Sequence, residues 1–406
     1  MSVRSPKLHI GINAQLLSFS GNYRNGGISR SIRGLLAGLA KDPGPHEYTV
    51  FVNGQDTIDR LGLGSPQITY VAAPWNEARP ISRITWEQLT LPSTVRKMGM
   101  DVLHSPANVL PEMLPSTCAG VVTLHDLAFL HFPKVLTPAK RIYHRTFTVR
   151  SLRRATMIIA VSDSTKQDAT QLVGVPAEHI RRVYTCMDER FSRLISDEES
   201  IAFRVKQGLP QGFLLYLGTL EPRKNITILL EAYARLRKNY PIKEKLVLAG
   251  GKGWYYEEIF ERVRNLGLES EVIFPGYVSD ADQPLWYHAA SAFVYPSLYE
   301  GFGLPVAEAL ACGTPVVTSD VSSLPEAGAG LALCVAPDDI QAMAEAMYKA
   351  ITDAELRRRC VNQAPQILKR FSAQRMAAET IGAYEQAAAR RVTKMSAGEL
   401  ALERRS

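Results

Sequence analysis

Two glutamates, Glu300 and Glu308, stand on either side of a glycine-rich turn in the second half of the chain. The residues between them, Gly-Phe-Gly-Leu-Pro-Val-Ala, predict a turn that leads into a helix, with Pro305 in its first position. Unpaired amides at a helix start attract a diphosphate, and carboxylates accept hydrogen bonds from hydroxyls. A nucleotide diphosphate sugar has both features. We therefore expect Glu300, in the turn, to face the sugar and Glu308, on the helix, to face the ribose.

A simpler explanation would hold for two isolated glutamates, namely a carboxylate in the first helical turn and a solvated loop residue. The glycines between them favour ligand binding, because they let the backbone approach a ligand closely. We therefore predict a donor-binding turn in which the amides of Gly303 and Leu304 stabilise the diphosphate. Its residues are Gly301, Phe302, Gly303 and Leu304.

Short apolar strands alternate with longer helical stretches along the chain. This alternation predicts an α/β fold with parallel sheets covered by helices, which would position the turn. We place the domain boundary near residue 192, so that the two domains span residues 1–192 and 193–371. The expected strands are 8–12, 48–52, 102–104, 121–124 and 157–161 in the first half, and 213–217, 245–248, 272–274, 292–295 and 315–318 in the second.

Polar residues follow two strands of the first half. Ligands in open α/β folds bind beyond the carboxyl ends of the strands, where these residues lie. Asn13 and Gln15 follow the first strand, and His125 and Asp126 follow the fourth. Histidine titrates near neutrality, so His125 suits hydrogen bonding to sugar hydroxyls and stabilisation of developing charge. An arbitrary histidine at a strand end would instead cap backbone carbonyls.

Adjacent positive charges at Arg223 and Lys224 lie between the strand 213–217 and the next helix. Lysine acts as a compact charge on a leaving diphosphate, and arginine can hold two oxygens at once. A solvated basic turn is the simpler alternative. For the base of the nucleotide we expect the loop that contains Tyr277 and Val278.

Six segments, in this order along the chain, resemble the retaining glycosyltransferases of family 4, and bacterial mannosyltransferases among them. The resemblance covers nearly the whole chain, and Glu300 and Glu308 match the E-x7-E signature of that family. The segments are Gly26-Gly27-Ile28, His125-Asp126, Gly218-Thr-Leu-Glu-Pro-Arg-Lys-Asn225, Ala249-Gly-Gly251, Phe274-Pro-Gly-Tyr277 and Glu300 to Gly313.

The resemblance implies a GT-B fold of two facing Rossmann-like domains with an interdomain cleft. The donor would be held mainly by the second domain and the acceptor by the first. A last helix, residues 372–406, would return to the first domain. Backbone amides of Gly26 and Gly27 would meet the donor phosphates, although a glycine pair alone indicates only a turn.

One position departs from the family pattern. Many members carry arginine where this chain has Thr219. Either Arg223 substitutes for that arginine, or Thr219 donates a hydrogen bond and Lys224 carries most of the charge. The resemblance also supports a functional rather than a capping role for His125.

The predicted chemistry is electrostatic stabilisation of a departing diphosphate by Lys224, Arg223 and the turn amides. The family implies retention at the anomeric carbon, and we expect front-face attack in which the acceptor hydroxyl passes its proton to the departing phosphate. Glu300 is the rival candidate, as a nucleophile. We expect no metal and no cofactor, because no DxD-like motif and no cluster with ligand spacing is evident. Asn13, Gln15 and Asp126 are the expected acceptor-binding residues.

The formal charge of +7 is unevenly distributed. Residues 127–162 contain seven Lys/Arg and no acidic residue, and such a stretch can dock on anionic lipids or on a lipid-diphosphate acceptor. A basic face is more often simply solvated, and the two interpretations have about equal weight here. We predict peripheral association with anionic membranes through this segment. Nucleic-acid binding is not expected, because no aromatic stacking motif accompanies the charge. The seven residues are Lys134, Lys140, Arg141, Arg145, Arg150, Arg153 and Arg154.

Composition agrees with a cytoplasmic enzyme that associates peripherally with a membrane. The 406 residues include 46% hydrophobic and 21% charged residues, an ordinary globular balance with enough apolar residues for two domains. No apolar run reaches the roughly 18 to 20 residues that span a bilayer, and the start of the chain does not have the pattern of a signal peptide. Five scattered cysteines indicate reduced thiols rather than disulfides or a metal site.

Three functions compete on these observations. A hexosyltransferase that uses a nucleotide sugar, with GDP-mannose favoured and UDP-linked hexoses next, fits the motifs best. An epimerase or phosphorylase-like enzyme of the same fold is the second. A dinucleotide-dependent oxidoreductase is the third, but residues 11–16 lack the G-x-G-x-x-G fingerprint after the first strand.

Overall fold

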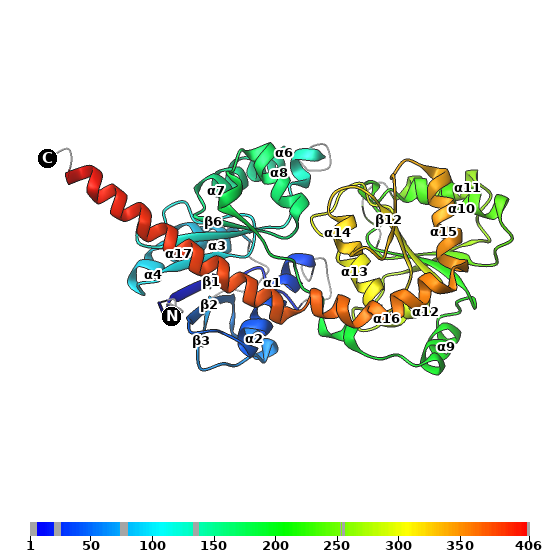
Figure 1. The fold of residues 1–406 in the computed structure, drawn as a ribbon, viewed down its shortest axis with the longest axis horizontal. Coiled ribbons are helices and arrows are strands. Elements are labelled where there is room, and N and C mark those ends of the chain that lie inside the picture. Colours follow the sequence, from blue (N-terminus) through cyan, green and yellow to red (C-terminus); the bar gives the residue numbers. More distant parts are fainter. Residues whose placement is uncertain are drawn as a thin grey trace. The chain divides into compact units, whose positions relative to one another are not determined.

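The computed structural model describes residues 6–19, 26–73, 80–132, 138–251, 253 and 256–403. Contacts divide the chain into two compact units, and unit 2 is inserted in sequence between two parts of unit 1. Unit 1 comprises Met1–Cys186 and Ala373–Ser406, and unit 2 comprises Met187–Ser372. Each unit consists of a parallel sheet with helices packed around it (Figure 1).

Unit 1 contains, in its described residues, a seven-stranded sheet in the order β3-β2-β1-β4-β5-β6-β7. Neighbouring strands are parallel throughout, and β1 pairs with β2 on one side and β4 on the other. The order of the strands therefore reverses at β1. The strands are β1 His9–Asn13, β2 Glu47–Asn53, β3 Ile68–Ala73, β4 Val102–Ser105, β5 Ala119–Leu124, β6 Met157–Ala160 and β7 Ile180–Arg182.

The helices of unit 1 connect these strands, and the last of them comes from the end of the chain. They are α1 Gly27–Lys41, α2 Gln55–Leu61, α3 Pro80–Thr85, η2 Trp86–Thr90, α4 Leu91–Lys97, α5 Ala128–His131, α6 Pro138–Tyr143, η4 His144–Thr148, α7 Val149–Arg154, α8 Asp163–Val173, η5 Ala177–His179 and α17 Ala373–Glu403. Two of these segments, η2 and η4, are single π-helical turns.

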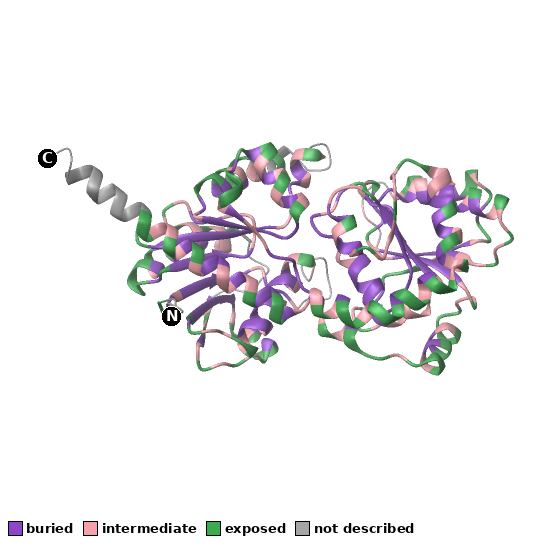
Figure 2. Cartoon of the chain, in the orientation of Figure 1, coloured by how far each residue is buried: buried purple, intermediate pink, exposed green. Residues whose placement is uncertain are grey.

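Both faces of the unit 1 sheet are covered, as expected for parallel strands that read as continuous apolar runs. Successive residues of a strand point to opposite faces. Val121 accordingly packs in the core formed with α1 and α17, while Val122 packs in the core formed with α7 and α8. Figure 2 shows the central strands of both units as buried.

Unit 2 contains, in its described residues, a six-stranded parallel sheet in the order β10-β9-β8-β11-β12-β13. The order reverses between β8 and β11, which pair directly. Its elements are η6 Glu189–Ser192, α9 Asp197–Lys206, β8 Phe213–Leu217, η7 Pro222–Lys224, α10 Ile226–Asn239, β9 Lys245–Ala249, α11 Glu257–Asn265, β10 Val272–Gly276, α12 Gln283–Ala289, β11 Ala292–Tyr295, α13 Leu304–Ala311, β12 Val316–Ser319, α14 Leu324–Gly328, β13 Leu333–Val335, α15 Ile340–Thr352 and α16 Ala354–Arg370.

Every predicted strand is present, with ends that differ by at most two residues. The three strands that were not predicted, β3, β7 and β13, all lie at a sheet edge. Helices cover the edge strands less completely than the central ones, so an edge strand does not need a continuous run of apolar residues. Strand β7 has one buried residue and β13 has none.

The chain passes from unit 1 to unit 2 earlier than the predicted boundary near residue 192. Cys186 packs against α1, because its sulfur occupies the space where a side chain on Gly34 would lie. The amide of the next residue, Met187, already donates to the carbonyl of Phe371 at 2.9 Å. Phe191 then packs on Tyr287, with 6.0 Å between ring centroids, so the predicted boundary falls inside unit 2.

Helix α17 returns to unit 1, where it packs mainly against α1. A Cβ atom on Gly38 of α1 would lie 2.2 Å from the carbonyl oxygen of Ala373 and 2.7 Å from the Cβ of Ala377. The two helices can approach this closely only because residue 38 is glycine. Within the described residues, no helix is long and apolar enough to cross a bilayer.

Candidate active site

The strand order of unit 2 reverses between β8 and β11, and in open α/β sheets ligands bind at such a reversal, beyond the carboxyl ends of the strands. The loop after β8 carries η7, and the loop after β11 leads into α13. A backbone hydrogen bond of 2.9 Å from the amide of Leu298 to the carbonyl of Arg223 joins the two loops. Both predicted cations and both predicted glutamates therefore belong to the elements that border this reversal.

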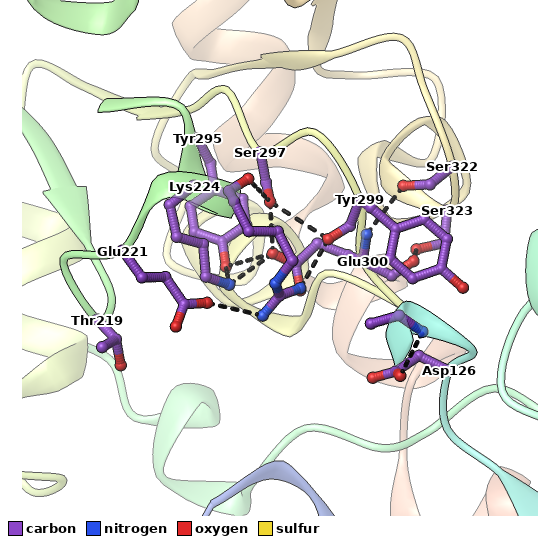
Figure 3. A network of polar contacts seen from close by, with 12 residues as sticks. Asp126, Thr219, Glu221, Lys224, Tyr295, Ser297, Tyr299, Glu300, Ser322 and Ser323 are labelled. Atoms are coloured by element: carbon purple, nitrogen blue, oxygen red, sulfur yellow. Dashed lines mark hydrogen bonds and ion pairs between the residues drawn. The ribbon is translucent and has the colours of Figure 1, made fainter. Parts of the chain in front are cut away.

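Glu300 is the centre of a polar cluster, which Figure 3 shows with the side chains of Lys224, Tyr295 and Ser297 directed toward it. Its Oε1 accepts hydrogen bonds from Lys224 Nζ at 2.5 Å, Ser297 Oγ at 2.7 Å and Tyr295 Oη at 3.1 Å. Its Oε2 lies 3.2 Å from Arg223 Nη1. Only 12% of the side chain is exposed, so protein groups hold this carboxylate on both oxygens.

The two cations determine the ionisation of Glu300. Burial alone would raise the pKa of this carboxyl, but the charges of Lys224 and Arg223 and the hydrogen bonds from Lys224 and Ser297 outweigh burial and lower the pKa to about 2. Glu300 is therefore an anion at every physiological pH. A carboxylate of such low basicity that accepts four hydrogen bonds is a poor nucleophile.

The cations are fixed as firmly as the carboxylate. Lys224 Nζ donates to Tyr295 Oη at 2.6 Å as well as to Glu300. Arg223 donates to the carbonyl of Tyr299 at 2.7 Å and to Glu221 Oε1 at 3.0 Å. The cluster thus contains two cations and two carboxylates, with positions fixed before any ligand binds.

The backbone of Glu300 is also held by residues that follow β12. Ser322 Oγ accepts from the amide of Glu300 at 3.1 Å, and Ser323 Oγ donates to its carbonyl at 2.9 Å. Tyr295 in turn stacks on Tyr216, with 5.9 Å between ring centroids. These contacts make the turn before α13 a rigid part of the unit.

Gly303 ends this turn and precedes the first residue of α13. Its φ is +94°, and a Cβ atom would lie 2.8 Å from Leu324 Cδ2, so both backbone strain and space demand glycine. Pro305 is the second residue of α13, one position later than predicted, and lies in its first turn. The backbone amides of Gly303 and Leu304 donate no hydrogen bond to any described residue. These two donors at the positive end of the helix suit an anion.

The remaining residues of the predicted donor site have different surroundings. Gly301 is buried in the turn. The ring of Phe302 packs on Phe371 at 5.1 Å, so this side chain contributes packing and only its backbone can serve a ligand. Glu308 is 3% exposed and accepts a hydrogen bond from Tyr287 Oη at 3.0 Å.

Three predicted donor residues lie outside the cluster around Glu300. Thr219 is exposed in the loop after β8, and its carbonyl accepts a hydrogen bond from Tyr216 Oη at 2.9 Å. Tyr277 is 70% exposed and Val278 is buried, both after the edge strand β10. Among the described residues, none of these three forms a hydrogen bond or an ion pair with Glu300.

In unit 1 the loops that follow the central strands hold His125 and Asp126. The backbone amide of His125 donates to Asn108 Oδ1 at 3.1 Å, and its Nε2 lies 3.0 Å from the carbonyl of Pro106. Burial lowers the pKa of His125, so the ring is neutral at pH 7. A neutral ring that donates through Nε2 leaves Nδ1 as an acceptor for a hydroxyl. Asp126 Oδ1 accepts from the amide of Ala128 at 3.0 Å.

Asn13 stands at the strand-order reversal of unit 1, beside residues that sequence reasoning did not select. Its Nδ2 donates to Glu87 Oε1 at 3.1 Å, while its Oδ1 is buried and has no partner among the described residues. Glu87 belongs to the π-helical turn η2, is 8% exposed, and pairs with Arg83 at 2.9 Å through both oxygens. π-Helical turns are common at functional sites.

The other predicted residues of unit 1 also lie in the segment that follows β1. Gln15 is buried, and its carbonyl accepts from Asn53 Nδ2 at 3.2 Å. Gly26 is the N-cap of α1 and Gly27 is its exposed first residue. A Cβ atom on Gly27 would meet nothing within 4 Å, so packing within unit 1 does not require glycine there.

The structure thus brings together Arg223, Lys224 and Glu300, with the amides of Gly303 and Leu304 in the same turn. Sequence reasoning missed Tyr295, Ser297, Ser322 and Ser323, which complete the cluster. They could have been found by the rule that gave Asn13 and His125, because Tyr295 is the last residue of β11, Ser297 follows it, and the two serines follow β12. Within the described residues, no group of three or more His, Cys, Asp or Glu side chains could hold a metal ion.

Comparisons with known proteins define the class to which this fold and site belong. The chain resembles solved GT-B glycosyltransferase structures. HepE of Anabaena, solved with UDP and glucose, has a TM-score of 0.65 and 19% identity, with 92% of this chain and 99% of HepE covered. Sucrose-phosphate synthase from Thermosynechococcus elongatus has a TM-score of 0.68 and 21% identity, with 94% of this chain and 99% of that chain covered. The predicted GT-B class of two Rossmann-like domains with parallel sheets is confirmed.

Sequence comparison identifies the family. The profile described as Glycosyl transferases group 1 matches residues 197–367, and the profile described as Glycosyltransferase Family 4 matches residues 25–191. O-antigen chain mannosyltransferase B of Escherichia coli is 35% identical over 286 residues, which cover 70% of this chain and 74% of the relative. Serotype-specific mannosyltransferase WbdA of Escherichia coli is 27% identical over 385 residues, 85% of this chain but 44% of that longer protein. The chain belongs to the family 4 glycosyltransferases.

Proposed function

We propose that this glycosyltransferase transfers a hexose, with mannose from GDP-mannose favoured, to a saccharide or lipid-linked acceptor with retention at the anomeric carbon. UDP-linked hexoses are the next candidates for the donor. The observation that carries the proposal is the cluster of Lys224, Arg223 and Glu300 beside the unpaired amides that begin α13. The mannosyltransferase names of the relatives support the choice of sugar.

In this proposal the diphosphate lies against the amides of Gly303 and Leu304, and Lys224 and Arg223 supply positive charge from the neighbouring loop. When the bond between the anomeric carbon and the phosphate oxygen breaks, negative charge grows on that oxygen. Donors that are already fixed stabilise this charge without reorganisation. Glu300 holds both cations in place, so it acts here as a positioning residue.

The acceptor hydroxyl attacks the same face from which the diphosphate leaves, and its proton passes to the departing phosphate oxygen. The low pKa of Glu300 and its four hydrogen bonds support this route over a covalent glycosyl-Glu300 intermediate. Neutral His125 accepts a hydrogen bond from a sugar hydroxyl through Nδ1, and Asn13, Gln15 and Asp126 bind the acceptor. This chemistry requires neither a metal nor a cofactor.

A thermal-shift panel of nucleotides and sugar nucleotides tests the donor, because a ligand that binds only the folded protein raises its stability. We expect GDP and GDP-mannose to raise the melting temperature of wild type, and Lys224→Ala and Glu308→Ala to reduce that shift. Lys245→Ala, at the other end of the sheet, is the matched control and keeps the full shift. A panel in which UDP-sugars shift the protein and GDP-mannose does not would reassign the donor.

Product analysis tests the reaction itself. The anomeric configuration of the product, measured by proton NMR, should equal that of the donor sugar. Mass spectrometry of the enzyme during turnover should detect no sugar on the peptide that contains Glu300. A stable adduct there would replace front-face attack by a double displacement, and release of free nucleotide without any acceptor would favour an epimerase or phosphorylase-like reaction.

We further propose that the enzyme acts on the cytoplasmic side of a membrane and docks on anionic lipids through the helical segment 138–154. Arg141 and Arg145 are exposed and have no ion-pair partner among the described residues, and Ile142 between them is 65% exposed. Cations beside an exposed apolar side chain suit a headgroup surface. Lys134 lies outside the described residues, as does the side chain of Lys140.

Not every cation of this segment is available for docking. Arg150 and Arg154 both pair with Glu112, at 3.1 Å and 2.7 Å, and Arg153 donates to the carbonyl of Val173. We therefore expect flotation with phosphatidylglycerol vesicles to be lost in Arg141→Glu/Arg145→Glu and largely kept in Arg150→Gln. Equal flotation of the double variant and wild type would remove this segment as the docking site.

A further inference from the structure

A polar pocket lies in unit 1, away from the strand-order reversal that holds the predicted acceptor residues. Its volume is about 470 Å³, and it is bordered by the start of α8, the segment from η5 to β7, and α17. Pockets of this size hold small-molecule ligands. The charged side chains that line it are Lys166, Arg181, Arg182, Arg390, Asp163 and Glu178.

The lining contains four cations and two carboxylates, and the cations are incompletely neutralised. Lys166 and Arg181 form no ion pair within the described residues. Arg182 lies 3.6 Å from Asp163 Oδ2 and 3.8 Å from Glu379 Oε2, and its Nη1 is buried without a hydrogen-bond acceptor. Buried donors in native proteins almost always have an acceptor. Nη1 is the Arg182 atom that pairs with Glu379 at 3.8 Å, a distance too long for a hydrogen bond.

Two contacts hold the arginines in position. The guanidinium of Arg182 lies over the ring of Tyr184, at 4.0 Å from its centroid. Arg181 lies against the backbone of α17, where a Cβ atom on Gly382 would be 2.7 Å from its Nη1 and 2.8 Å from its Nη2. Glycine inside a helix is less stable than alanine by about 1 kcal/mol. Gly382 therefore makes helix α17 less stable, and it lies where a side chain would displace Arg181.

We propose that this pocket is a binding site for a phosphate group, carried by a small metabolite or by a lipid headgroup. Arginine forks bind phosphate oxygens in pairs, and lysine adds a compact charge. Arg181 and Lys166 supply positive charge that no carboxylate pairs with in the described residues, and Arg182 adds a third positive charge to the lining. The pocket belongs to unit 1 and the proposed diphosphate site to unit 2, so its occupant would be a regulator or a second part of the acceptor.

Glucose 6-phosphate and inorganic phosphate test the site on the full-length protein, by isothermal titration calorimetry at constant ionic strength. We expect both ligands to bind wild type, and Lys166→Gln/Arg181→Gln to weaken binding at least tenfold. Arg96→Gln/Lys97→Gln removes the same charge from α4, outside the pocket, and should bind as wild type does. Lys224→Ala should also bind normally, which separates this site from the donor site.

Gly382→Ala gives a second test that does not depend on charge. Alanine favours a helix, so the variant should fold, but its methyl group displaces Arg181 and should weaken phosphate binding at least fivefold. Vesicles that contain phosphatidic acid distinguish the source of the phosphate group. Flotation that depends on Lys166 and Arg181, without binding of the soluble phosphates, supports the lipid form of the proposal. Binding of neither probe, or equal binding by wild type and both pocket variants, overturns it.

Discussion

Glu300 is the centre of the polar cluster, and we propose that it positions the two cations rather than reacts. Lys224 and Arg223 need a nearby anion when no diphosphate is bound, because buried cations are costly without one. Glu300 supplies it, and the same ion pairs hold the two cations at the start of α13. The E-x7-E pattern predicted that this glutamate matters, but the expected contact with the sugar remains a prediction.

The charge of Glu300 should make folding stability depend on pH. Its pKa falls from 4.5 in the unfolded chain to about 2 in the folded protein. The resulting stabilisation, about 3 kcal/mol, is fully present above pH 4.5 and is lost as pH falls toward 2. We expect Glu300→Gln to be less stable than wild type at pH 7, and this difference to shrink between pH 4.5 and 3.

Urea unfolding of wild type and Glu300→Gln at pH 7, 4.5 and 3 measures this difference. Glu258→Gln, an exposed carboxylate of α11, is the matched control and should differ from wild type by less than about 0.5 kcal/mol at each pH. A difference for Glu300→Gln that stays constant from pH 7 to 3 would mean that its charge does not stabilise the fold.

His125 should affect transfer more than donor binding. We expect His125→Ala to lower kcat about 100-fold, in the range for a positioned polar side chain, and to leave the Kd for the nucleotide unchanged. Since burial lowers the pKa of His125, this residue should add no pH dependence to the wild-type rate above pH 7. His131→Ala, on the neighbouring helix α5, is the control. Equal turnover of His125→Ala and wild type would remove His125 from the site.

At the scale of elements, α17 joins the end of the chain to the sheet of unit 1. His104 of β4 lies between Tyr384 of α17 and Thr123 of β5, with hydrogen bonds of 2.7 Å and 2.8 Å. Burial lowers the pKa of His104 to about 3, so the folded protein keeps it neutral. The unfolded chain binds a proton below pH 6.5, and this residue therefore reduces stability as pH falls from 6.5 toward 3.

The contact between α1 and α17 can be tested at one glycine. We expect Gly38→Ala to lower the free energy of unfolding by about 2 kcal/mol, because its methyl group would force the two backbones apart. Gly27→Ala, in the same helix, meets nothing within 4 Å and should leave stability within about 0.5 kcal/mol of wild type. Equal stability of the two variants, measured by urea unfolding, would contradict this packing.

At the scale of the whole molecule, the candidate donor residues belong to unit 2, apart from Gly26 and Gly27, and the candidate acceptor residues belong to unit 1. Hydrogen exchange followed by mass spectrometry can separate the two. We expect GDP to slow exchange in the peptides that cover residues 215–225 and 296–308, since a bound nucleotide stabilises the backbone that holds it. Lys224→Ala should abolish this protection. Protection confined to unit 1 would place the nucleotide there instead.

Much of the fold could be predicted from the sequence, and the missing parts have a common cause. The central strands are buried on both faces, so their apolar runs are long enough to recognise. The edge strands β3, β7 and β13 are partly exposed; β3 and β7 carry polar residues, and β13 is apolar but only three residues long. The division between the units lies six residues before the predicted boundary near residue 192, because residues 187–191 form no distinctive linker and Phe191 packs on Tyr287 of unit 2.

The sequence by itself determined the central strands, the turn before α13 and the identity of the charged residues, because periodicity, glycine and proline act over a few neighbouring positions. Only the tertiary structure decided which of these residues meet. Lys224 and Glu300 are 76 residues apart, and they touch because β8 and β11 pair in parallel at the reversal of the strand order. The contacts of Ser322 and Ser323 with Glu300 depend in the same way on the pairing of β11 with β12. Strand pairing over such distances is set by the packing of the whole sheet, which no local pattern records.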